Sequence, residues 1–165
     1  MKRMTYLFFL VPMLAPYVAS AETPMLTPDT FDVIVGDDWS GDLTYLNYGE
    51  PVQDFTIPAE LEIERVEMGL KMAFKYPDEP HQNSIMTARV SADGSMLSGA
   101  PVTLNAMSDI STREIRTEYP CEDMGKAASC EMIYQIRSDQ LVMRKMVTYS
   151  GETEAFRRNE YVFTR

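Results

Sequence analysis

The sequence predicts an all-β domain in which antiparallel strands form a barrel or a sandwich. Most of the chain after residue 40 alternates polar and apolar side chains with a period of two, as strands with one buried face do. Turn-forming segments at residues 92–95, 138–140 and 150–152 interrupt these stretches, and no long helical blocks separate them. Many short strands joined by tight turns are typical of antiparallel β-architectures.

Five alternating segments are the clearest strand candidates. They cover residues 43–48, 114–119, 131–136, 141–149 and 156–163. In the second segment, Ile115, Thr117 and Tyr119 would share one face of the sheet, and their charged neighbours would share the other.

Residues 57–77 fit two descriptions. Pro58 is followed by acidic residues and good helix formers, so residues 58–68 could form a helix. The apolar residues also alternate from Val66 to Tyr76, and Gly69 would weaken a helix interior. We favour two strands, at residues 57–66 and 70–77, with a turn or bulge at Gly69; the helix is the alternative.

The N-terminus has the pattern of a cleaved signal helix, residues 1–21. Lys2 and Arg3 precede an apolar run at residues 6–14, and a small-x-small motif ends at Ala21, before Glu22. A membrane span needs about 20 apolar residues, so this run is too short to remain as an anchor. We therefore expect a periplasmic or secreted protein with no stable membrane span after processing.

The rest of the chain fits one domain. Residues 22–30, with Pro24 and Pro28, are expected to form an irregular lead-in, and residues 31–165 the folded domain. The chain has a net charge of −10 and no basic cluster, which argues against nucleic acid as a partner. The sequence does not predict an oligomeric state.

The two cysteines, Cys121 and Cys130, are predicted to form a disulfide, because an even number of nearby cysteines in an exported protein usually pairs. The polar residues between them are expected to form an irregular loop. A redox-active pair is the alternative, but such pairs usually have Cys-x-x-Cys spacing.

Two segments carry a family resemblance. Gly36 and Trp39 open the first clear strand, and Arg157 and Arg158 lie in the last. A Gly and Trp on the first strand, with an Arg of the last strand over the indole, resembles the closure of lipocalin-like (calycin) β-barrels. Together with the loop at residues 76–84, the pattern looks like a group of uncharacterised secreted bacterial lipocalin-like proteins. This resemblance implies an antiparallel up-and-down barrel of about eight to ten strands around an apolar cavity. In it, Arg157 or Arg158 would cap Trp39, and no activity is established.

From the phase of the strands, six side chains are candidates for lining that cavity: Tyr45, Met72, Phe74, Tyr134, Met143 and Tyr161. We expect no cofactor and no metal site. His81 is the only histidine, and the sulfurs of Met143 and Met146 would point to opposite faces of a strand.

The sequence contains no nucleophile motif, so we do not expect an enzyme, although acid–base chemistry by a buried carboxylate and a tyrosine stays open. The favoured interpretation is an extracytoplasmic protein that binds an apolar or amphipathic small molecule or a lipid. The alternative is an envelope structural or protein-interaction domain with a filled barrel. A small hydrolase or isomerase on the same scaffold is the third interpretation.

Overall fold

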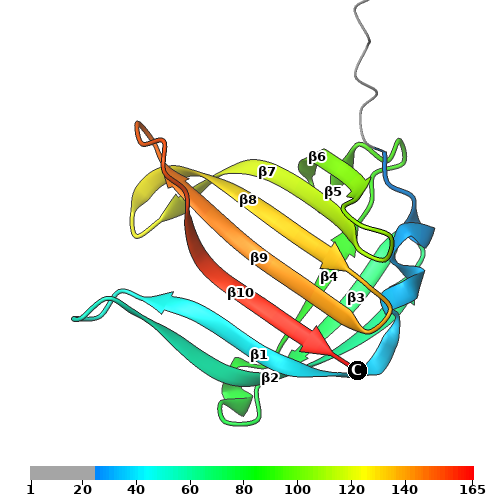
Figure 1. Ribbon diagram of the computed structural model, residues 1–165, viewed down its shortest axis with the longest axis horizontal. Coiled ribbons are helices and arrows are strands. Elements are labelled where there is room, and N and C mark those ends of the chain that lie inside the picture. Colours follow the sequence, from blue (N-terminus) through cyan, green and yellow to red (C-terminus); the bar gives the residue numbers. More distant parts are fainter. Residues whose placement is uncertain (1–24) are drawn as a thin grey trace, which may run out of the picture.

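The computed structural model describes residues 25–165 as one antiparallel sheet of ten strands that curls into a nearly closed barrel (Figure 1). The strand order is β4-β3-β2-β1-β10-β9-β8-β7-β6-β5, so each strand lies beside its neighbour in sequence except where β1 meets β10. The prediction of an all-β, up-and-down barrel is confirmed. The expected signal helix and its cleavage site at Ala21 and Glu22 lie outside the described residues.

The strands have these bounds: β1 (Gly36–Asn47), β2 (Gln53–Val66), β3 (Gly69–Lys75), β4 (Ser84–Arg89), β5 (Met96–Leu97), β6 (Ala100–Met107), β7 (Arg113–Asp123), β8 (Lys126–Ile136), β9 (Gln140–Tyr149) and β10 (Phe156–Thr164). Two 3₁₀ helices, η1 (Pro28–Ile34) and η2 (Pro80–Gln82), complete the described structure. Neither helix of residues 25–165 has the length and apolar character of a membrane span.

The ambiguous segment forms strands, so the helix alternative for residues 58–68 is wrong. Residues Glu60 to Val66 of β2 pair with Gly69 to Lys75 of β3. The acidic side chains that suggested a helix face outward, and Glu64 pairs with Lys71 on β3 at 2.8 Å. Gly69 is required because a Cβ there would lie 1.9 Å from the carbonyl oxygen of Ala88 on β4. Cross-strand pairing therefore overrides the local helix propensity.

The expected irregular lead-in, residues 22–30, differs from the structure only from Pro28, where η1 begins; residues 22–24 lie outside the described part. Leu26 is buried, and its backbone N–H donates to the carbonyl of Gly94. Helix η1 then buries Phe31 and Ile34 in the main core. In Figure 1 this helix covers the right-hand end of the barrel, which is therefore the closed end.

Trp39 seals the closed end. Its side chain is 1% exposed, and its indole N–H donates to the carbonyl oxygen of Ile34 at 2.9 Å. The guanidinium of Arg165 lies 4.4 Å from the centre of the ring. That group also donates to the carbonyls of Val33, at 2.8 Å, and Val35, at 3.1 Å. One cation thus fixes both the indole and the end of η1.

The expectation that Arg157 or Arg158 caps the indole is wrong. Both lie at the start of β10, whereas Trp39 lies beside the end of that strand. Arg157 pairs with Asp54 on β2, and Arg158 stacks on Tyr48 near the opposite end of the barrel. The antiparallel direction of β10 brings Arg165, which follows the strand, to the indole instead.

The predicted disulfide between Cys121 and Cys130 is confirmed. The loop between them is not irregular, because β7 and β8 continue to a two-residue turn. Met124 and Gly125 occupy this turn with φ values of 50° and 72°. Positive φ at both central residues is the conformation that matches the twist of antiparallel strands. The disulfide therefore joins two neighbouring strands of a hairpin.

Candidate ligand cavity

The register of the strands arranges the barrel interior in levels. The lower of two central levels runs through side chains that belong to the main core or pack on it: Ile115, Tyr134, Met143, Tyr161, Leu43 and Ile57. Residues two positions away on the same strands face the same side and form the next level. This upper level is Thr117, Met132, Lys145, Asn159, Tyr45 and Phe55. The lower level is apolar apart from its tyrosine hydroxyls, and the upper level carries amide, hydroxyl and ammonium groups.

Below these levels the interior is filled. Leu61, Leu141 and Phe163 are at most 1% exposed and belong to one core cluster with Trp39. A ligand cannot reach the closed end without displacing them, so any cavity lies above this floor.

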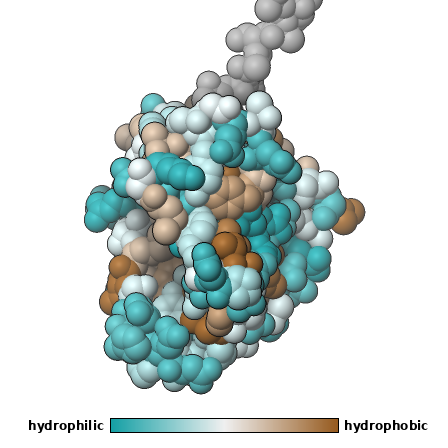
Figure 2. Space-filling model, turned by 90° about the vertical axis from the view of Figure 1, so that its left-hand side faces the viewer, coloured by the Kyte–Doolittle hydropathy of each residue, from teal (hydrophilic) through white to brown (hydrophobic). Residues whose placement is uncertain are grey.

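Two hollows open on the interior side. One, of about 290 Å³, lies between β4 and β8 and is lined by Met86, Leu97, Thr117, Tyr119, Met132 and Tyr134. The other, of about 330 Å³, lies beside β1, β2 and η2 and is lined by Leu43, Tyr45, Ile57, Tyr76, Glu79 and Gln82. Figure 2 looks at the end of the barrel opposite η1 and shows hydrophobic side chains exposed among hydrophilic ones. Each hollow is near the lower size limit of small-molecule sites.

The six residues predicted to line a cavity all belong to the interior, but at different depths. Tyr45 and Tyr134 line the two hollows. Met72 and Phe74 are buried in the floor and Met143 in the lower central level, all at 3–4% exposure. Tyr161 is half-buried and packs on the core. Their roles toward a ligand remain predictions.

Two tyrosines form a polar contact at the edge of the floor. The hydroxyls of Tyr76 and Tyr161 lie 2.7 Å apart, and the ring of Tyr161 lies 5.1 Å from that of Phe74. Burial, followed by the contact with Tyr76, raises the pKa of Tyr161 well above its ordinary value. Burial also raises the pKa of Tyr134 to about 12. Tyr134 and Tyr161 are therefore neutral near pH 7, and Tyr134 lines the hollow between β4 and β8.

An ionic cluster ties the strand ends together opposite the closed end. Asp123, at the end of β7, accepts hydrogen bonds from the hydroxyls of Tyr48 and Tyr149 and from Nε of Arg158, the last at 3.0 Å. Arg158 also donates to the carbonyl of Leu46 at 2.7 Å. Burial opposes ionisation of Asp123, but these hydrogen bonds outweigh it and lower its pKa. The cluster joins β1, β7, β9 and β10, although β1 and β7 are not neighbours in the sheet.

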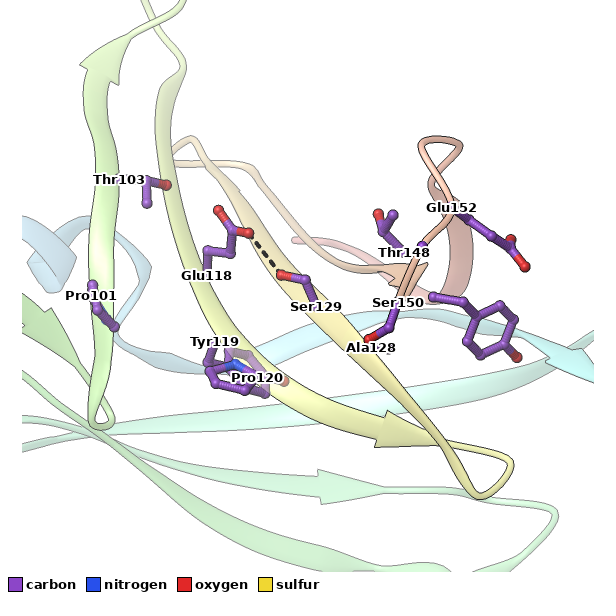
Figure 3. A pocket seen from close by; sticks show the side chains of 12 residues that line it. Pro101, Thr103, Glu118, Tyr119, Pro120, Ala128, Ser129, Thr148, Ser150 and Glu152 are labelled. Carbon is purple, nitrogen blue, oxygen red and sulfur yellow. Dashed lines mark hydrogen bonds between the residues drawn. The ribbon is translucent and has the colours of Figure 1, made fainter.

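A third hollow, of about 650 Å³, lies on the outer face (Figure 3). Glu118 and Ser129 form part of its lining and are joined by a hydrogen bond of 2.7 Å. Thr103 and Thr148 line it from either side. Glu118 alternates along β7 with the interior residue Thr117 and therefore faces the outer side, whereas Tyr119 lines both this hollow and the β4–β8 hollow.

The structure contains no arrangement for metal binding within the part of the chain that it describes: no three His, Cys, Asp or Glu side chains converge there. His81 lies exposed in η2. Met143 is an interior residue of β9, and Met146, three positions later, faces outward.

The main groups that the sequence analysis missed are Arg165, Asp123 and Lys145. Arg165 and Asp123 follow or end strands, and their partners come from distant segments, so no local pattern marks them. For Lys145 a signal existed: it occupies the inward phase of a strand whose other inward residues are apolar.

No protein-family model matches the chain, and a search of curated proteins finds no significant match. The fold alone defines the class: a nearly closed, up-and-down antiparallel barrel, compatible with a lipocalin-like fold. The disulfide in a barrel of this size is consistent with an extracytoplasmic location.

Proposed function

We propose that this protein is an extracytoplasmic binding protein, periplasmic or secreted, that holds a small hydrophobic or amphipathic molecule in its barrel. The observation that carries the proposal is the incomplete filling of the interior. The floor is closely packed, whereas about 290 and about 330 Å³ remain open above it. Tyrosine and methionine side chains line these hollows, and flexible methionines adapt to ligands of varied shape.

A neutral fluorescent dye tests this proposal. Nile red should bind the purified protein with micromolar affinity, about −8 kcal/mol, and its emission should shift to the blue. Tyr134→Glu, which places a charge in the wall of the β4–β8 hollow, should abolish the shift. Thr148→Glu on the outer face should leave it unchanged. Both variants need melting curves, so that loss of binding is separated from loss of fold.

The alternative is an interaction domain of the envelope, and one observation supports it. Ile85 is 67% and Met86 47% exposed on β4, which has a partner strand on only one side over most of its length. Absence of binding by Nile red and by other neutral apolar dyes would favour this alternative over the cavity.

A further inference from the structure

The structure places one cation inside the barrel without a counter-ion. Lys145 lies in the upper level of interior side chains, opposite Met132 on β8 and Asn159 on β10. It is half-buried, and it forms no ion pair and no side-chain hydrogen bond with any residue of the described range 25–165. Lysine is rarely withdrawn from water unless it is paired.

Nine of the thirteen lysines and arginines in residues 25–165 form an ion pair, and Lys145 is one of the four that do not. The outward-facing Lys71 and Lys75 pair with Glu64 and Glu62. Arg144, the residue before Lys145, points to the outer face and pairs with Glu160. The other described cations without a carboxylate are Arg89 and Lys126, which are exposed, and Arg113, which donates to the side chain of Asn105 at 2.7 Å. Among these residues, Lys145 alone is half-buried without a polar side-chain partner.

The carboxylate at the mouth of the barrel is already engaged. Asp123 accepts three hydrogen bonds, from Tyr48, Tyr149 and Arg158, which leaves it little capacity for a further cation. Glu79 lines the hollow beside η2 but forms no contact with Lys145 among the described ion pairs.

The residues beside Lys145 are a polar neighbour, Asn159, and residues that line the two hollows. Asn159 is directly opposite on β10, where side chains of paired strands have Cβ atoms about 5 Å apart. Its amide is half-buried and has no side-chain hydrogen bond in the described structure. Met132, on the other side, lines one hollow, and Tyr45, beyond Asn159, lines the other. Lys145 and Asn159 thus lie between the two hollows.

We propose that Lys145, assisted by the amide of Asn159, binds the anionic head group of an amphipathic ligand whose apolar part lies in the adjoining hollows. This inference rests on the proposed function and specifies the class of ligand. An ammonium supplies three hydrogen-bond donors, and Asn159 supplies two more. A carboxylate bound there would provide the counter-ion that Lys145 lacks in the described structure. The tyrosine and methionine side chains of the walls would contact the apolar chain of the ligand.

The test compares ligands with the same chain and different head groups. Dodecanoate, dodecan-1-ol and dodecyltrimethylammonium are titrated, below their aggregation concentrations, against the protein loaded with Nile red at pH 8 and low salt. The wild-type protein should bind dodecanoate about 10- to 100-fold more tightly than the alcohol, as expected for a charge-assisted hydrogen bond in a partly buried site. The quaternary amine should bind most weakly.

Three variants assign the preference to its residue. Lys145→Met keeps the length and the apolar stem, and should lose the preference for dodecanoate while still binding dodecanol and Nile red. Lys145→Arg should retain the preference. Lys71→Met, which removes an outward-facing lysine of the same charge, is the matched control and should behave as the wild type.

The outcomes separate the two proposals. If Nile red and dodecanol bind but Lys145→Met leaves dodecanoate affinity unchanged, the head-group proposal is overturned and the cavity stands. If Lys145→Met loses dodecanol and Nile red as well, Lys145 has a structural role and the head-group proposal also fails. If none of the probes binds the wild-type protein, the cavity and the head-group site fail together.

Discussion

Replacement of Trp39 by alanine should destabilise the protein more than most single substitutions in the barrel. The indole is 1% exposed. A buried tryptophan removes about 200 Å² from water, and at about 25 cal/mol per Å² this contributes roughly 5 kcal/mol. The carbonyl of Ile34 would also lose its donor, and Arg165 its aromatic partner. We expect Trp39→Ala to lower the free energy of unfolding by about 3–5 kcal/mol, since some of the space is refilled.

Urea denaturation followed by circular dichroism, with the disulfide intact, measures this change. Two further variants separate the contribution of the indole hydrogen bond from that of Arg165. Trp39→Phe keeps an aromatic ring but loses the hydrogen bond to Ile34, and should cost about 1–2 kcal/mol. Arg165→Met removes the cation and its bonds to three backbone carbonyls, and should cost about 1–3 kcal/mol. A loss below about 1 kcal/mol for Trp39→Ala, a small fraction of the area-based value, would refute the assignment of the indole as the seal.

Three other predictions concern the mouth and the walls of the barrel. Protein folded under oxidising conditions should show no free thiol by alkylation and mass measurement, and reduction of Cys121–Cys130 should cost about 2–3 kcal/mol in urea titrations. Asp123 has a lowered pKa in the folded state, so its contribution is present above about pH 4 and is lost as the pH falls further. Asp123→Asn should cost about 2–3 kcal/mol at pH 7 and flatten that acid dependence; an unchanged acid profile would contradict the role of the cluster. The phenol of Tyr134 has a pKa raised from 10.0 to about 12, so its contribution is present below pH 10 and is lost as the pH rises toward 12. Between pH 8 and pH 11 the wild type should therefore lose about 1.4 kcal/mol more stability than Tyr134→Phe. Equal losses in both proteins would refute the assignment.

The strands were predictable because alternation is a local property of the chain. Residues 114–119 and 131–136 fall within β7 and β8, and Gly69 marks the turn that separates β2 from β3. Helix η1 was missed because Pro24 and Pro28 suggest irregular chain, whereas the burial of Phe31 and Ile34 depends on contact with the finished barrel. The expected compartment and the cysteine spacing were enough to predict the disulfide. The hairpin around it depends on the cross-strand register, which the sequence does not specify.

The candidate site was predictable in part. Strand phase places Tyr45 and Tyr134 on the inner face, as the structure shows, but phase alone does not distinguish the filled floor from the open upper level. Met72 and Phe74 share the phase and lie in the floor. The inward phase of Lys145 follows from the alternation of its own strand, but its level is defined by pairing across six strands.

The pairing of β1 with β10 has a consequence for how the protein folds. Every other strand pairing in residues 25–165 joins segments that are consecutive in sequence, so β1–β4 and β5–β10 can each form as a local meander. Ser40 and Thr164, by contrast, must meet across almost the whole domain. Loop-closure entropy makes such a contact slow to form. We expect the β1–β10 seam to form last and to open first, so its amides should exchange with deuterium ahead of those in the two meanders.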